Sequence, residues 1–199
     1  MNRLHERAHE NQCTILTYLA SFDCLSKRLI ALLLHGEETN SSISYAERIT
    51  KRMITRGLVG RKTAGDGIYR YFLAEKGTYE AGELLRFQPR NGFERSYLNA
   101  ARFDVLHENV IRDMHEHNGT GLGRGALRHL FPKLRDIDAA LTVLEDNQDR
   151  RFKFFYMKID TLAESSMDRF DRATRLANRY NARIKILGPD FIRKKLAKR

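Results

Sequence analysis

Cysteine is scarce in this chain, and long apolar runs are missing. The 199 residues include two cysteines, Cys13 and Cys24, which are too few for a disulfide framework or a zinc site. Both lie in apolar helical patterns, so we interpret them as ordinary buried thiols. No apolar segment approaches the roughly 20 residues that a membrane-spanning helix needs, and residues 1–10 are charged rather than signal-like. We therefore expect a cytoplasmic protein with no membrane partner.

Positive charge is what the chain has in excess. It carries 36 Lys and Arg against 25 Asp and Glu, a net charge of +11, and 42% of its residues are hydrophobic. A chain of this length and composition can bury a real core in one large or two small domains, so it is not a disordered basic tail. Residues 87–99 contain Pro, Asn and Gly without a hydrophobic period, which predicts a linker between domains at 1–86 and 100–199.

The most informative segment is an amphipathic helix predicted to begin at Ser44. Ser44 and Glu47 have the spacing of a capping box, in which each side chain bonds the other residue's amide. Ala46, Ile49 and Met53 repeat at helical spacing and predict one apolar stripe, while the remaining surface is largely cationic. Gly57 suits the left-handed position that follows a last helical turn.

A strand-like pair follows this helix and completes a recognisable unit. The runs beginning at Leu58 and Ile68 have strand composition, and Gly65-Asp66-Gly67 supplies the turn between them. Two apolar helical patterns, at 14–22 and 25–34, precede a polar segment at 36–42 that is interpreted as a loop. This order predicts a winged helix-turn-helix domain.

The charge of the unit favours double-stranded DNA as its partner. Between Ser44 and Tyr71, seven Lys or Arg stand against two acidic residues, a local net charge of +5. Phosphates supply most of the affinity for DNA and base edges supply specificity, so a basic helix beside a basic hairpin matches both requirements. A solvated basic helix without a ligand is the alternative. The predicted DNA-binding residues, which need no cofactor, are Ser44, Tyr45, Arg48, Lys51, Arg52, Arg56, Arg61, Lys62 and Arg70.

The second half of the chain predicts an α/β domain with one small sheet, so the whole chain is expected to be of the α+β or α/β class. The pattern begins with a helix at 101–116 and a Gly-rich loop at 118–125. Strands are expected near 126–130, at 138–144 and at 152–160, with a turn at 145–150. A long helix at 162–180, a strand at 183–187 and a basic terminal helix complete the order.

Two other patterns in this half are interpreted as structural. His115 and His117 are two residues apart on a helix and point in different directions, so they cannot form an i, i+4 pair of metal ligands and are expected at the surface. The alternating glycines of residues 119–125 lack the Gly-Lys-Ser/Thr that a phosphate-binding loop requires, so a flexible loop is expected there.

The element order and a few polar positions between about residues 104 and 188 resemble the PD-(D/E)XK superfamily of nucleases. The resemblance implies a catalytic site of Glu108, Asp138, Lys158 and Asp160, with Asp138 and Asp160 as ligands of Mg²⁺ or Mn²⁺. Tyr156 departs from the pattern because it stands where the family has an acid two residues before the Lys. Either Asp160 replaces that ligand, or the fold is kept without the reaction.

Both halves together resemble the winged-helix replication-relaxation family and MobC-type plasmid mobilisation proteins. Arg56-Gly57-Leu58-Val59, the run from Tyr71 to Gly77, and Leu106-His107-Glu108 carry the resemblance. It implies a prokaryotic protein of a plasmid or other mobile element, acting in replication or conjugation at an origin or a promoter. Three interpretations stay open: a double-stranded DNA-binding protein, a metal-dependent nickase, and an adaptor that recruits replication or transfer proteins on an inactive nuclease fold. A homodimer is a further option that the sequence leaves undecided.

Overall fold

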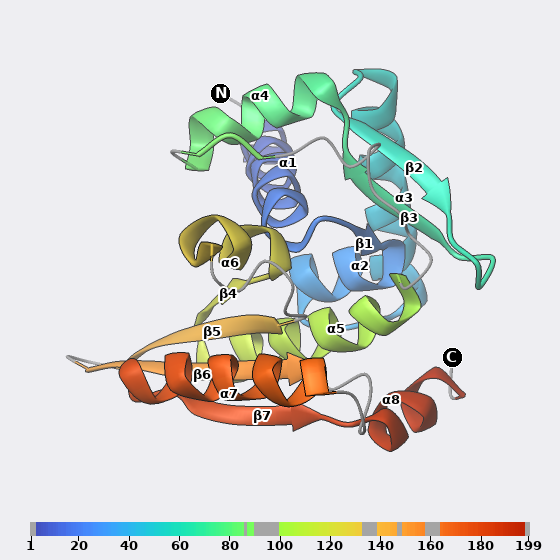
Figure 1. Ribbon diagram of the computed structural model, residues 1–199. Coiled ribbons are helices and arrows are strands. Elements are labelled where there is room, and N and C mark those ends of the chain that lie inside the picture. Colours follow the sequence, from blue (N-terminus) through green and yellow to red (C-terminus); the bar gives the residue numbers. More distant parts are fainter. Residues whose placement is uncertain are drawn as a thin grey trace. The chain divides into compact units, whose positions relative to one another are not determined.

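The computed structural model describes residues 3–85, 87–89, 100–132, 139–146, 149–157 and 164–197 (Figure 1). These residues form a mixture of helices and small sheets, which confirms the predicted α+β class. The chain divides into two compact units, Met1–Ala100 and Ala101–Arg199, and each unit is described by itself. Within the described ranges, no helix has the length and apolar character needed to cross a membrane.

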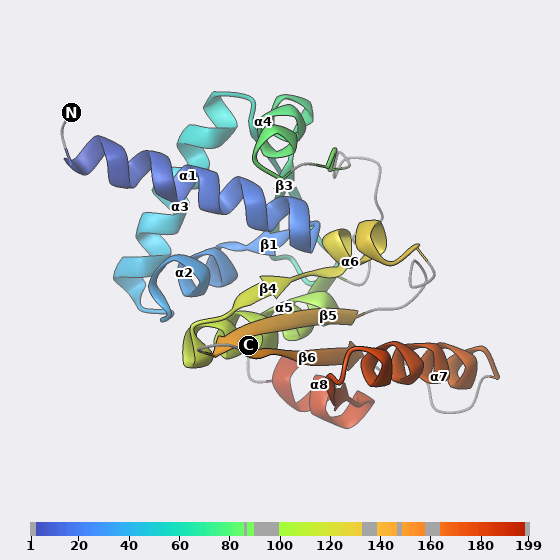
Figure 2. The ribbon, with the colours of Figure 1, turned by 90° about the vertical axis from the view of Figure 1, so that its left-hand side faces the viewer.

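The first unit consists of helices around a three-stranded antiparallel sheet. In chain order its elements are α1 (Arg3–Phe22), β1 (Leu25–Ser26), α2 (Lys27–His35), α3 (Asn40–Thr55), β2 (Val59–Thr63), β3 (Tyr69–Leu73) and α4 (Glu75–Leu85). The strand order is β1-β3-β2, so the central strand β3 pairs with both others. Figure 2 shows α1 lying across α3.

Helical periodicity places the core of this unit where the sequence predicts it. Ile15, Leu16, Leu19 and Phe22 recur at spacings of three and four on α1, and all four are buried. On α2, the residues from Leu29 to Leu33 are buried as well. The two predicted helices therefore exist, although α1 begins far ahead of residue 14.

The start of α3 corrects the capping-box prediction. Thr39 is the N-cap, and its hydroxyl oxygen accepts a hydrogen bond from the Ser42 amide at 3.2 Å. The predicted loop at 36–42 therefore ends at Thr39, and Ser44 lies inside the helix. Glu47 does not cap it, because its carboxylate pairs with the Lys27 ammonium at 3.1 Å. The predicted end of the helix is confirmed, since Gly57 has a φ of +71°.

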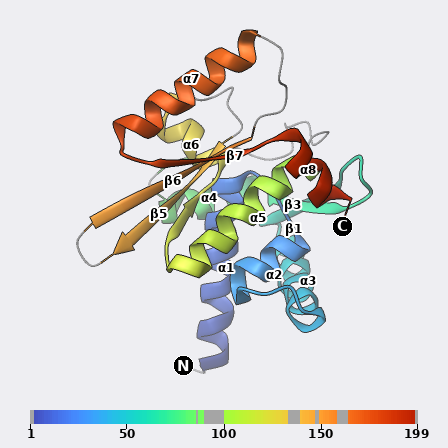
Figure 3. The same cartoon turned by 90° about the horizontal axis from the view of Figure 1, so that it is seen from below.

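The second unit places helices on both faces of a four-stranded sheet. Its elements are α5 (Ala100–His117), β4 (Thr120–Leu122), α6 (Arg124–Leu130), β5 (Ala139–Asp146), β6 (Asp149–Met157), α7 (Glu164–Arg179), β7 (Arg183–Leu187) and α8 (Pro189–Leu196). The strand order is β4-β5-β6-β7; β4, β5 and β6 pair antiparallel, whereas β7 runs parallel to β6. In Figure 3, α5 and α7 lie on opposite faces of the sheet.

Alternation along the strands explains the two faces. Ala139 and Leu141 of β5 pack with Leu127 of α6 and with Ala173 and Ala177 of α7 in one apolar cluster. The alternate residues of β5 face the opposite side of the sheet. Thr142 is buried on that side, opposite Lys153 in the β5–β6 register, and Lys153 reaches a carboxylate of α5.

Three expectations for this unit are wrong in detail. Residues 126–130, predicted as a strand, belong to α6, where Ala126 and Leu127 are buried at adjacent helical positions. The Gly-rich segment contains β4, and a Cβ at Gly121 would lie 2.2 Å from Met114 Sδ, so glycine lets this strand approach α5 closely. The predicted turn at 145–150 is shorter, because β5 reaches Asp146 and β6 begins at Asp149.

Candidate nucleic-acid interface

The outward face of α3 is a polar and basic stripe. Ser44, Arg48, Lys51 and Thr55 follow one another at spacings of four, three and four, so they share one side of the helix. All four are exposed, whereas Ala46, Ile49 and Met53 on the opposite side are buried. The apolar stripe thus anchors the helix and leaves two cations, with two hydroxyl groups, facing outward.

The flank of α3 beside this stripe is covered by the N-terminal half of α1. Asn11 Nδ2 donates a hydrogen bond to the Tyr45 hydroxyl at 2.8 Å, and Arg56 Nη1 donates one to Gln12 Oε1 at 2.6 Å. Tyr45 also meets the His35 ring edge-on, with 5.2 Å between ring centroids. Tyr45 and Arg56, both predicted to bind DNA, therefore hold α1 against α3.

A groove of about 350 Å³ lies between these two helices. His5 and His9 of α1 line one side of it, and Arg48 and Arg52 of α3 line the other. The Arg48 guanidinium lies 5.8 Å from the centroid of the Tyr45 ring, close enough for a cation–π contact. The sequence does not predict the contribution of residues 5–12, because they have no apolar pattern that would extend the first helix to them.

The β2–β3 hairpin presents further cations. Arg61 and Lys62 are exposed on β2, and the Arg61 guanidinium stacks over the Tyr69 ring of β3 at 4.9 Å from its centroid. The turn is tight: the Ala64 carbonyl accepts a hydrogen bond from the Gly67 amide at 3.0 Å, and Gly67 has a φ of +75°. The predicted hairpin and its two cations therefore exist.

Arg70 does not belong to this surface, which corrects its prediction as a DNA contact. Its side chain is 1% exposed, and its two terminal nitrogens donate to the two carboxylate oxygens of Asp66 at 2.7 and 2.6 Å. One of those nitrogens also donates to the Ile68 carbonyl at 3.1 Å. The hydrogen bonds from Arg70 lower the pKa of Asp66. Arg70 thus fixes the hairpin turn from inside.

Of the four residues predicted to form a nuclease site, the structure describes one, Glu108. Glu108 is buried on α5, and its Oε1 accepts from Arg112 Nε at 3.1 Å and from Lys195 Nζ of α8 at 3.4 Å. Asp138, Lys158 and Asp160 lie outside the described residues. Two cations thus already compensate the charge of Glu108.

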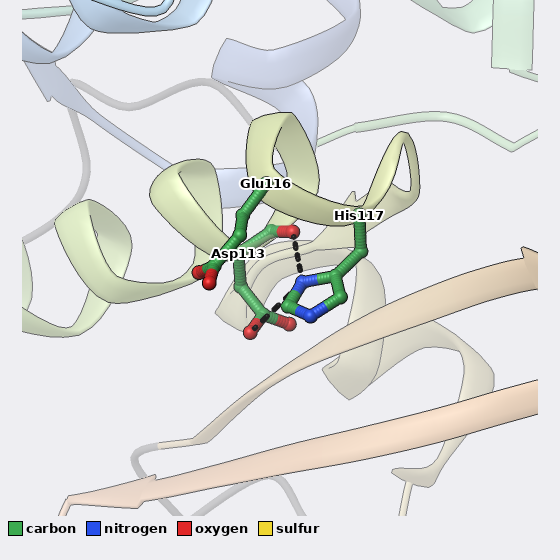
Figure 4. A group of neighbouring side chains, drawn as sticks. All are labelled: Asp113, Glu116 and His117. Atoms are coloured by element: carbon green, nitrogen blue, oxygen red, sulfur yellow. Dashed lines mark hydrogen bonds and ion pairs between the residues drawn. The ribbon is translucent and has the colours of Figure 1, made fainter.

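Asp113, Glu116 and His117 form a second acidic group on α5, in which one possible ligand atom from each lies within 4.8 Å of the others. Figure 4 shows Glu116 and His117 on either side of Asp113. His117 Nδ1 lies 3.1 Å from the Asp113 carbonyl oxygen and 3.7 Å from its Oδ1, and the Lys153 ammonium binds the same Oδ1. The i, i+4 spacing of Asp113 and His117 is the signal that the sequence carries for this group, and the Lys153 ammonium already binds one of the Asp113 carboxylate oxygens.

Comparison of this chain with family models, curated proteins and solved structures gave no match. A proposal for the function of this chain therefore depends on the geometry of each unit and on the resemblance of its sequence motifs.

Proposed function

We propose that the first unit is a winged helix-turn-helix that binds double-stranded DNA, with α3 as the recognition helix and the β2–β3 hairpin as the wing. The observation that carries the proposal is the exposed stripe on α3, in which Arg48 and Lys51 stand between two hydroxyl residues. Arg can read the edge of a guanine with two hydrogen bonds, and Lys and hydroxyl groups can contact bases or phosphates.

The order of elements supports this assignment. A short strand between the first two helices pairs with the second hairpin strand, so β1 fixes the hairpin to the helical part of the unit. The exposed cations of the hairpin, Arg61 and Lys62, therefore belong to the same compact unit as α3. A helix that enters the major groove with a basic hairpin beside it can contact bases and backbone together.

The resemblance to plasmid mobilisation proteins makes mobile-element DNA, at an origin or a promoter, the proposed target. A metal-dependent nickase is not proposed. The observation that favours the binding protein over the nickase is that Glu108, the described member of that site, is paired with Arg112 and Lys195. The second unit is proposed to keep a nuclease-like sheet as a scaffold rather than for that reaction.

The test is duplex binding by the full chain, measured by fluorescence anisotropy over a range of salt concentrations. We expect Arg48→Ala with Lys51→Ala to weaken binding at least tenfold. If both side chains neutralise phosphates, the slope of log K against log salt should fall by about 2, since each neutralised phosphate accounts for about 0.9 of that slope. Lys76→Ala, which removes an exposed charge from α4, is the control and should change little.

Two results would overturn the proposal. The first is an Arg48/Lys51 double variant that binds duplex DNA with the affinity and salt slope of the wild type. The second is cutting of supercoiled plasmid in the presence of manganese that disappears in Asp138→Ala, since the second unit would then be a nuclease rather than the proposed scaffold.

A further inference from the structure

A second groove, of about 490 Å³, lies in the second unit between the end of α6 and the C-terminal half of α7. Leu130, Phe131 and Pro132 line one side, and the side chains of α7 with Tyr180 line the other. This volume is within the range of pockets that bind small molecules or single groups of larger ones.

The α7 side of the groove is a row of arginines. Arg172, Arg175 and Arg179 are separated by three and four residues, so they share one face of the helix over about 10 Å. Arg172 is paired with Asp168, with 3.1 Å between Nε and Oδ2. Arg175 and Arg179 are exposed, and neither has a hydrogen-bonding or ion-pairing partner among the residues that the structure describes.

Arg175 and Arg179 lie outside the apolar contacts that pack the helix. Ala173 and Ala177, on the other face of α7, hold it against the sheet and are almost fully buried. The guanidinium groups of Arg175 and Arg179 are therefore on the exposed face of α7, away from the sheet.

The end of the row carries exposed aromatic and apolar surface. Tyr180 is 42% exposed, and its ring meets Phe131 edge-to-face with 5.7 Å between centroids and 68° between planes. Leu130 beside them is 52% exposed. A large apolar group next to unpaired cations favours a ligand that is both anionic and aromatic.

We propose that this groove binds single-stranded nucleic acid, with Arg175 and Arg179 on phosphates and one base stacked on the Tyr180 ring. Grooves that bind single strands combine a cationic track with aromatic platforms in this way. In a duplex the base faces are already stacked on one another, so the ring of Tyr180 would gain nothing. An acidic peptide would use the arginines and leave the ring uncovered. The site is independent of the duplex interface on the first unit.

The experiment measures the binding of the full chain to a labelled oligothymidine and to a labelled duplex by fluorescence anisotropy. Both measurements are repeated in the Arg48→Ala/Lys51→Ala variant. We expect the double substitution Arg175→Ala with Arg179→Ala to weaken single-strand binding at least tenfold and to leave duplex binding unchanged. The slope of log K against log salt for the single strand should fall by about 1.4, since each neutralised phosphate accounts for about 0.7 of it. Tyr180→Ala should weaken single-strand binding at least fivefold, whereas Tyr180→Phe keeps the ring and should bind as the wild type does.

Arg183→Ala with Lys194→Ala removes the same charge from other exposed positions of this unit and is the control. The proposal fails if the Arg175/Arg179 variant keeps wild-type single-strand affinity, or if the control loses as much. It also fails if polyglutamate binds through these arginines and the oligonucleotide does not. Loss of duplex binding in the Arg48/Lys51 variant, with single-strand binding intact, would support both sites separately.

Discussion

The Asp66–Arg70 pair should be the most sensitive point of the first unit. Asp66→Ala removes the two carboxylate bonds of the Arg70 guanidinium, whose side chain is 1% exposed. Removing one partner of a buried pair costs about 3–5 kcal/mol. Because the Asp66 side chain is 26% exposed, we expect the low end, about 3 kcal/mol.

A double-mutant cycle separates this effect from other losses in the turn. Arg70→Met removes the buried charge while keeping an extended apolar side chain, so Asp66→Ala should cost less than about 1 kcal/mol in that background. Hydrogen exchange of peptides from residues 59–73 is the suitable assay, since a melting curve of a two-unit chain mixes both units. Equal costs of Asp66→Ala in the two backgrounds would refute the ion-pair argument.

The stabilisation by the Asp66–Arg70 pair should decrease in acid. Hydrogen bonds from Arg70 lower the pKa of Asp66 in the folded chain, so the folded state binds its proton less readily than the unfolded chain does. The stabilisation is therefore complete above the unfolded pKa of about 4 and is lost as the pH falls through the lowered folded value. The difference in exchange protection between the wild type and Asp66→Asn should be constant near neutral pH and should shrink in acid.

Three further substitutions test the remaining structural arguments, each by thermal unfolding or hydrogen exchange. Thr39→Ala should cost about 1 kcal/mol by removing the cap of α3, whereas Ser44→Ala, at an exposed helical position, should cost nothing; the reverse would restore Ser44 as the start of the helix. Gly77→Ala should cost about 2 kcal/mol or more, because its Cβ would lie 1.9 Å from the Leu58 carbonyl oxygen, while Gly65→Ala meets nothing within 4 Å and is the control. Lys153→Met should cost about 3 kcal/mol, because it leaves Asp113 buried and without its ammonium partner; stability like that of the wild type would show that the pair contributes little.

Local patterns in the sequence were enough to predict most elements. The strand predicted at 183–187 is β7 with the same bounds, and the glycine predicted to end α3 is in the left-handed conformation. The sequence places the beginning of α3 too late because several residues between Thr39 and Ser44 are of the types preferred at an N-cap. The choice between them depends on the Ser42 hydroxyl, which donates to the Glu37 and Thr39 carbonyls and fixes the turn before the helix.

The candidate site shows where such patterns stop being sufficient. Composition and spacing identify which side chains are cationic, but not which cations are already engaged. The count of basic residues predicts Arg70 as a DNA contact, yet Asp66, four residues earlier across a tight turn, holds its guanidinium in the interior. That partner was visible in the sequence, since a turn brings such positions together.

The partners of Tyr45 and Arg56 were not visible, because Asn11 and Gln12 lie more than thirty residues away along the chain. These contacts change the nature of the proposed interface. With Tyr45 and Arg56 holding α1, the cations left for DNA on α3 are Arg48, Lys51 and Arg52, and the histidines of α1 border the same groove. If α3 enters the major groove, the N-terminal half of α1 then lies against its flank. Substitutions at His5 or His9 should therefore affect DNA binding, although neither residue lies on the recognition helix.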